Sequence, residues 1–191
     1  MKGMKEKTMG AVSVFTKRYV FLFAMVSVWI LSSLPVFAVD SKETQYTLTG
    51  LKGVKIVVEE MQPGMRKYEK SVNKFGLNSE QVQRDIEQRL QYAGIRVLTP
   101  DVWTNTPGRP VLYVNINTHE NEKYWLAYDI SIDLHQLVSM ESNPKIKTLA
   151  STWSMNVTGI TNIGTLNVIR NNILYLVDRF IGAYKAVNNK R

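Results

Sequence analysis

Hydrophobic and polar residues alternate along three stretches in the second half of the chain, residues 112–117, 126–135 and 149–157. A period of two places every second side chain on the same face of a β-strand, so the apolar residues share one face and the polar residues the other. The stretches therefore predict an antiparallel meander that is covered on one face and open to water on the other. In the last stretch, Leu149 and Trp153 are expected on the covered face.

The turn between the first two of these strands sets their register. The predicted turn consists of residues 121–123. It places Asn115 opposite Asp129. It also places His119 opposite Trp125, so we expect these pairs across the first hairpin.

Two longer stretches repeat their apolar residues every three or four positions, which is typical of helices that cover a core. The first begins after Asn78, a favourable N-cap, and ends at Gly94. The second spans residues 165–188. The first helix lies between apolar runs at 54–58 and 95–98. A strand, a helix and a strand in this order predict a crossover between two parallel strands.

Strand-like alternation also begins earlier, at Tyr46 and Leu48, and residues 62–76 lack any period and are expected to form a loop. The full pattern predicts an α+β domain with the element order β-α-β-β-β-β-α. We expect a single mixed sheet of about five strands, with two long helices packed on one face and the other face open.

The segments VKIVVEEM (54–61) and SEQVQRDIEQRLQYAGIRVLTPDVW (79–103), followed by strands and a closing helix, carry a resemblance to a known family. The pattern is similar to the small bacterial envelope module of the TolB N-terminal domain and of related curli-secretion and penicillin-binding-protein-activator lipoproteins. The resemblance implies an exported scaffold or assembly module, and it implies no catalytic residues. The chain departs from the lipoprotein members because it has no cysteine to acylate.

The N-terminus has the pattern of a secretory signal peptide. A basic stretch precedes an uncharged apolar run at residues 19–34, and Val36 and Ala38 supply the small residues of a cleavage site. We predict that residues 1–38 are removed and that residues 39–191 form a single domain in the periplasm or outside the cell. The alternative is an inner-membrane anchor formed by residues 19–34.

Removal of the signal changes the charge of the protein. The chain has 24 Lys and Arg against 16 Asp and Glu, a net charge of +8. Residues 1–38 carry five basic and one acidic residue, so their loss leaves +4. This modest surplus does not favour nucleic acid as a partner. Membrane contact is expected only if the N-terminal segment is retained.

The sequence predicts neither a metal ion nor a cofactor. The chain has two histidines, His119 and His135, and no cysteine. The predicted register keeps the two imidazoles roughly 33 Å apart along the strands. The glycine-bounded stretch 159–164 lacks the lysine that a phosphate-binding loop needs.

One polar cluster offers an enzymatic alternative. Asp133 and His135 lie two residues apart on one strand face, which they share with Asp129. With Thr152 or Ser154 from the next strand they would resemble a Ser-His-Asp set, which suggests a hydrolase. Side chains at this spacing stand about 6.5–7 Å apart and usually meet water, so an ordinary polar face is the preferred interpretation.

A basic segment is the first candidate binding surface. Its four cations and Glu69 give the loop a local charge of +3, which suits an anionic lipid, a glycan or an acidic partner. A flexible solvated loop is the alternative. The cations are Arg66, Lys67, Lys70 and Lys74.

The open polar face of the sheet, with aromatic residues at its margins, is the second candidate. A broad uncharged face can accept a protein or another envelope component. An ordinary wet face is the alternative. From the export signal, the compact α+β pattern and the lack of a catalytic motif, we predict a non-enzymatic binding or envelope-assembly module that is exported to the periplasm. The candidate contact residues are Tyr113, Asn115, Asn117, Trp125, Ser131 and Thr152.

Overall fold

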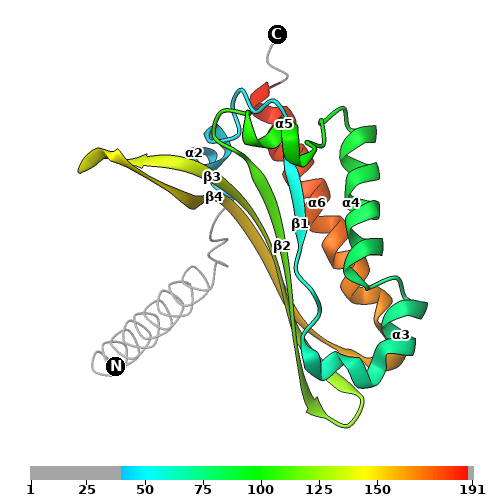
Figure 1. Cartoon of the computed structure of the whole chain (residues 1–191). Helices are drawn as coiled ribbons and strands as arrows, with labels where there is room; N and C mark the ends of the chain where they lie inside the picture. Colours follow the sequence, from blue (N-terminus) through cyan, green and yellow to red (C-terminus); the bar gives the residue numbers. More distant parts are fainter. Residues whose placement is uncertain (1–39, 189–191) are drawn as a thin grey trace, which may run out of the picture. The chain divides into compact units, whose positions relative to one another are not determined.

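The computed structural model describes residues 40–188 (Figure 1). The predicted signal peptide, residues 1–38, and the alternative anchor, residues 19–34, lie outside the described residues. Within residues 40–188, no helix combines the length and the apolar character that crossing a bilayer requires.

Over residues 40–188 the sheet has four strands, in the order β1-β2-β3-β4. The first pair is parallel and the other two pairs are antiparallel, so the prediction of an α+β fold with one mixed sheet is confirmed. The strands are β1 (Lys55–Val58), β2 (Val111–Glu122), β3 (Trp125–Met140) and β4 (Asn143–Asn162).

The predicted fifth strand at residues 95–98 is wrong. This segment makes a single parallel bridge, between Val97 and Val54. Val54 donates its N–H to the Arg96 carbonyl and accepts from the Leu98 N–H. The chain then turns at once into the short helix α5 (Pro100–Thr104), which leaves no length for further pairing.

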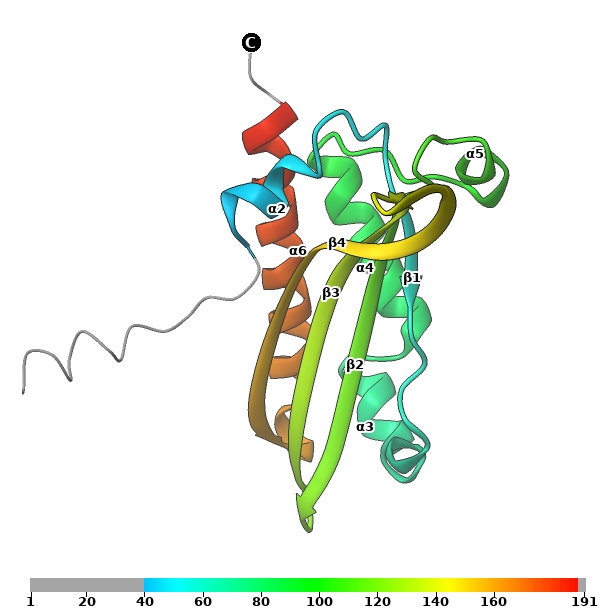
Figure 2. The same ribbon diagram turned by 90° about the vertical axis from the view of Figure 1, so that its left-hand side faces the viewer.

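Helices form the second layer of the domain. Figure 1 shows α4 and α6 on the same side of the sheet, and Figure 2 shows the sheet in front of both. The remaining helical elements are short. Besides α5, the helices are α2 (Lys42–Tyr46), η1 (Pro63–Tyr68), α3 (Glu69–Lys74), α4 (Ser79–Tyr92), η2 (Ile163–Thr165) and α6 (Asn167–Asn188).

Two other predicted elements differ in the structure. The strand expected to begin at Tyr46 is wrong, because Tyr46 ends helix α2 and β1 begins only at Lys55. The Ser41 hydroxyl caps the start of α2 in a reciprocal capping box. The loop expected at residues 62–76 contains η1 and α3. Buried Met65 and Val72 attach these elements to the core.

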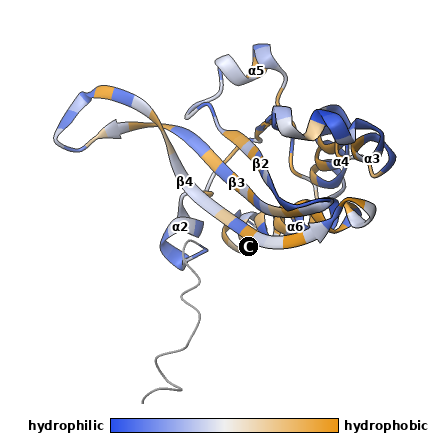
Figure 3. Ribbon diagram, turned by 90° about the horizontal axis from the view of Figure 1, so that it is seen from below, coloured by the Kyte–Doolittle hydropathy of each residue, from blue (hydrophilic) through white to orange (hydrophobic). Residues whose placement is uncertain are grey.

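The core lies between the sheet and the two long helices. α4 buries Val82, Ile86 and Leu90, the stripe expected from the sequence. The Asn78 side chain accepts a hydrogen bond from the Gln81 N–H and caps the helix as predicted. Figure 3 shows apolar residues gathered between the sheet and the helices.

The predicted register of the β2–β3 hairpin is wrong by two residues. Glu122 pairs with Trp125, so the turn has two residues, and Tyr124 in it has φ of +69°. As a result, Asn115 lies opposite Ser131, and His119 lies opposite Ala127. A shift of two residues leaves every side chain on its predicted face.

A bulge in β4 changes the faces of the following residues. Leu134 pairs with Trp153, but His135 pairs with Ser151, so Thr152 is an extra residue. Leu149 therefore leaves the covered face and is 52% exposed, which corrects its predicted burial. Beyond the bulge, residues 136–150 continue the hairpin as an arm past the core (Figure 1).

Candidate functional site

The face of the sheet away from α4 and α6 carries rows of polar side chains. Asn115, Ser131 and Asn156 form one row across β2, β3 and β4. Asn117 and Asp129 begin the adjacent row. The side chains of β2 and β3 in these rows are half-buried. This face therefore brings together four predicted contact residues, Tyr113, Asn115, Asn117 and Ser131.

An aromatic pair stands at one end of this face. The rings of Tyr113 on β2 and His135 on β3 are stacked, with centroids 5.5 Å apart and planes 13° from parallel. The Tyr113 hydroxyl donates to Glu59 Oε2 at 2.8 Å. This hydrogen bond, together with partial burial, raises the pKa of Tyr113. The ring is thus held as a neutral, fixed platform.

Asp133 lies beside this pair and is oriented by two hydroxyls. Ser131 Oγ donates to Asp133 Oδ2 at 3.1 Å, and Ser151 Oγ donates to Asp133 Oδ1 at 3.3 Å. None of the hydrogen bonds among residues 40–188 joins His135 to Asp133. A base oriented by a carboxylate is what a Ser-His-Asp set needs. The observed network orients the carboxylate instead.

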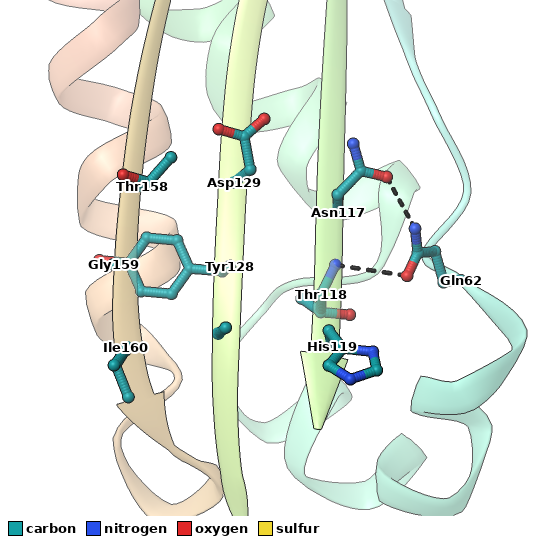
Figure 4. Close-up of a pocket in the computed structure, with 10 residues that line it drawn as sticks. Gln62, Asn117, Thr118, His119, Tyr128, Asp129, Thr158, Gly159 and Ile160 are labelled. Carbon is teal, nitrogen blue, oxygen red and sulfur yellow. Dashed lines mark hydrogen bonds between the residues drawn. The ribbon is translucent and has the colours of Figure 1, made fainter. Parts of the chain in front are cut away.

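A shallow depression of about 590 Å³ lies at the other end of the face (Figure 4). Gln62 spans one side of it, donating to Asn117 Oδ1 at 2.7 Å and accepting from the Thr118 N–H at 3.4 Å. Asp129 and Thr158, which are paired across β3 and β4, line the floor. Gln62 could not be identified from the sequence pattern, because it lies in an irregular segment immediately before η1.

The basic segment retains less free charge than its sequence suggests. Lys67 forms an ion pair with Glu120 on β2, and Tyr68 also donates to that carboxylate. Lys74 lies 5.3 Å from the centroid of the Phe75 ring. Arg66 lines a separate pocket of about 440 Å³. Arg66, Lys67, Lys70 and Lys74 are all exposed.

Glu120 is the group whose ionisation we expect to matter most at low pH. Hydrogen bonds from Lys67 and Tyr68 lower the pKa of its carboxyl to about 2, from an ordinary value of 4.5. A carboxyl with a depressed pKa stabilises the fold fully above its unfolded pKa and loses that effect as pH falls toward its folded pKa.

We therefore predict that Glu120→Gln flattens part of the acid dependence of stability between about pH 4.5 and about pH 2. Urea unfolding at a series of pH values measures this. Glu122→Gln, on the same strand but exposed, is the matched control and should keep the wild-type slope. Identical slopes in Glu120→Gln and wild type would contradict the prediction.

Two predicted contact residues lie apart from the polar rows. Trp125 stands next to the β2–β3 turn and is 47% exposed. Thr152 occupies the β4 bulge, where its hydroxyl donates to the Leu134 carbonyl and accepts from Gln136. In addition, α2 approaches here, since Thr47 donates to the Thr152 carbonyl at 3.2 Å.

The histidines lie far apart along β2 and β3. His135 pairs with Val111 and His119 pairs with Ala127, at opposite ends of the hairpin body. Over the described range 40–188, no three residues among His, Cys, Asp and Glu are grouped so that they could hold a metal ion.

Comparison with known proteins adds no family to this description. The chain matches no protein-family model, no curated protein and no solved structure. The resemblance to the TolB N-terminal domain therefore stays a prediction, and function has to be argued from the geometry of the site.

Proposed function

We propose that this protein is a non-enzymatic binding or assembly module of the bacterial envelope, and that it binds its partner through the open polar face of the sheet. One observation carries the proposal. Tyr113 on β2 is held by Glu59 and stacks on His135 of β3, and Asp133 on β3 is held by Ser131 and by Ser151 of β4. A surface that is already ordered loses little conformational entropy when a partner binds.

The proposed partner is a protein or another envelope component with polar groups. Carboxylates, amides and hydroxyls of the face offer acceptors and donors, and the Tyr113–His135 pair offers a rigid aromatic contact. Arg66, Lys70 and Lys74 supply positive charge for a secondary contact with an anionic lipid or glycan. The proposal includes no cofactor and no nucleic acid.

Export to the periplasm is part of the same proposal. It rests on the signal-like pattern of residues 1–38. Asp40, the first described residue, accepts hydrogen bonds from Gln45, Trp153 and Arg179. Cleavage after Ala38 would leave these contacts in place, so the domain keeps its N-terminal attachment after processing. Retention of residues 19–34 as an anchor is the alternative.

Photo-crosslinking in the bacterium that encodes the protein tests the binding face. A photoreactive phenylalanine analogue at Asn115 is expected to give a discrete adduct in the envelope fraction. The same analogue at Gln88, which is exposed on α4, is the control and should give none. Adding Tyr113→Ala should reduce the Asn115 adduct at least about fivefold, because a rigid aromatic anchor is lost.

Equal adducts from both positions, or none from Asn115, would reject the open face as the binding site. Ester turnover tests the hydrolase alternative around Asp129, Asp133 and His135. A turnover that disappears in both Asp133→Ala and His135→Ala, with unchanged thermal unfolding, would replace the binding proposal with an enzymatic one.

A further inference from the structure

The outer edge of β4 is unusual for an edge strand. β4 is the last strand in the sheet order, so the backbone groups on its far side face no other strand of the described chain. Edge strands are commonly protected by charged residues, prolines or short length. β4 is 20 residues long, and its residues 148–162, TLASTWSMNVTGITN, contain neither charge nor proline. This edge therefore lacks the usual protection against pairing.

The two edges of the sheet differ in this respect. On the β1 side, Val54 already pairs with residues 96–98, and β1 itself has only four residues. On the β4 side, α2 reaches the edge only at the bulge, through the contact of Thr47 with Thr152. The stretch from Trp153 to Asn162 is left for pairing. One open edge permits a closed dimer, whereas two open edges would permit a fibre.

Helix α6 presents a second surface beside this edge. Val168, Asn172, Tyr175 and Arg179 recur at steps of three or four and form one stripe. The stripe lies alongside β4. Asn172 donates to the Tyr128 hydroxyl, which lies against Gly159, and Arg179 pairs with Asp40 beside Trp153. Val168 and Tyr175 are 37% and 51% exposed within it. Figure 2 shows α6 behind the outer strand.

We propose that this edge pairs with the same edge of a second copy of the chain, so that two sheets join through antiparallel β4 strands into one eight-stranded sheet. The lack of charge in this stretch favours a second copy of the chain as the partner. The stretch left for pairing, residues 153–162, contains no charged residue, so a twofold antiparallel pairing of this stretch opposes no like charges.

The charged residues of α6 nearest this edge do not favour a different partner, because each already forms an ion pair. Arg179 pairs with Asp40, Asp178 pairs with Arg89, and Arg170 pairs with Asp85. This part of the edge thus carries no free charge that would attract a positively or a negatively charged strand. A neutral strand rich in Thr, Asn, Val and Ile is its complement, and β4 is such a strand.

The position of helix α6 over the sheet is compatible with the same dimer. α6 packs on both β3 and β4 from one face of the sheet. Paired strands lie about 4.8 Å apart, so the two α6 helices would come within about 10 Å, the range of packed helices. Val168 and Tyr175 would then be buried between the helices, and Ile160, now 68% exposed, would contact the opposite strand.

Sedimentation equilibrium of the full chain, from about 1 to about 100 µM, tests the proposal. We expect a monomer–dimer equilibrium in the wild type. Asn156→Lys and Asn156→Glu each place a like charge in the pairing stretch of both copies, and each should weaken dimerisation at least about tenfold. A mixture of the two variants should recover the dimer, because opposite charges then meet.

Asn115→Lys is the matched control. Asn115 lies in the same row and on the same face as Asn156, but on β2, two strands from the edge. This variant should dimerise like the wild type. Tyr175→Lys tests the helix contact and should also weaken the dimer. A monomeric wild type, or an Asn156→Lys variant that associates as tightly as Asn115→Lys, would overturn the proposal. So would a mixture that stays monomeric.

Discussion

Trp153→Ala is expected to lower the free energy of unfolding by about 3–5 kcal/mol. Trp153 is 1% exposed and is among the largest buried side chains of the domain. Its ring meets Phe180 of α6 edge-on, with centroids 5.3 Å apart, and its Nε1 donates to Asp40 Oδ1 at 3.1 Å. Alanine would leave a cavity between sheet and helix and would remove one partner from a half-buried carboxylate.

Trp125→Ala provides the matched control. Trp125 is 47% exposed, so its truncation should cost about 1 kcal/mol or less. Urea unfolding followed by circular dichroism measures both losses, at one protein concentration because dimerisation would shift the midpoint. Equal losses in the two variants would show that Trp153 does not anchor β4 to α6.

Gly159→Ala is expected to lower stability by about 1–3 kcal/mol, although alanine normally suits a strand better than glycine. A Cβ at this position would overlap the Tyr128 hydroxyl and would lie 2.6 Å from Tyr128 Cζ. The Tyr128 ring cannot retreat freely, because its hydroxyl accepts a hydrogen bond from Asn172 at 2.8 Å. In a Tyr128→Leu background, the cost of Gly159→Ala should shrink, because the shorter side chain removes the overlap.

Gly182→Ala is the control, and its expected effect on stability is opposite to that of Gly159→Ala. Gly182 lies within α6, where an added Cβ meets no atom within 4 Å. Alanine is a better helix former than glycine, so this variant should gain about 0.5–1 kcal/mol. The same urea titrations compare the two. If Gly159→Ala also stabilised the protein, the close approach of Tyr128 to β4 would be refuted.

The prediction of the candidate site failed where side chains from irregular segments matter. Alternation placed Tyr113, Asn115 and Ser131 on one open face, and this is where they lie. The alternation gave no indication that Gln62 forms a hydrogen bond with β2, or that Glu120 forms an ion pair with Lys67 of the basic segment. Such contacts depend on how η1 lies against β2, and residues 62–76 have no period that could show it.

The sequence by itself determined the elements whose pattern is strong. Periods of two and of about 3.6 identified the meander and the two long helices, and Asn78 marked the start of α4. Tertiary structure decided the finer features. The two-residue turn reset the β2–β3 register, the Thr152 bulge moved Leu149 into solvent, and residues 95–98 made one bridge instead of a strand. The reason is that a pattern records which side of an element is buried, while register and pairing depend on contacts between segments far apart in the chain.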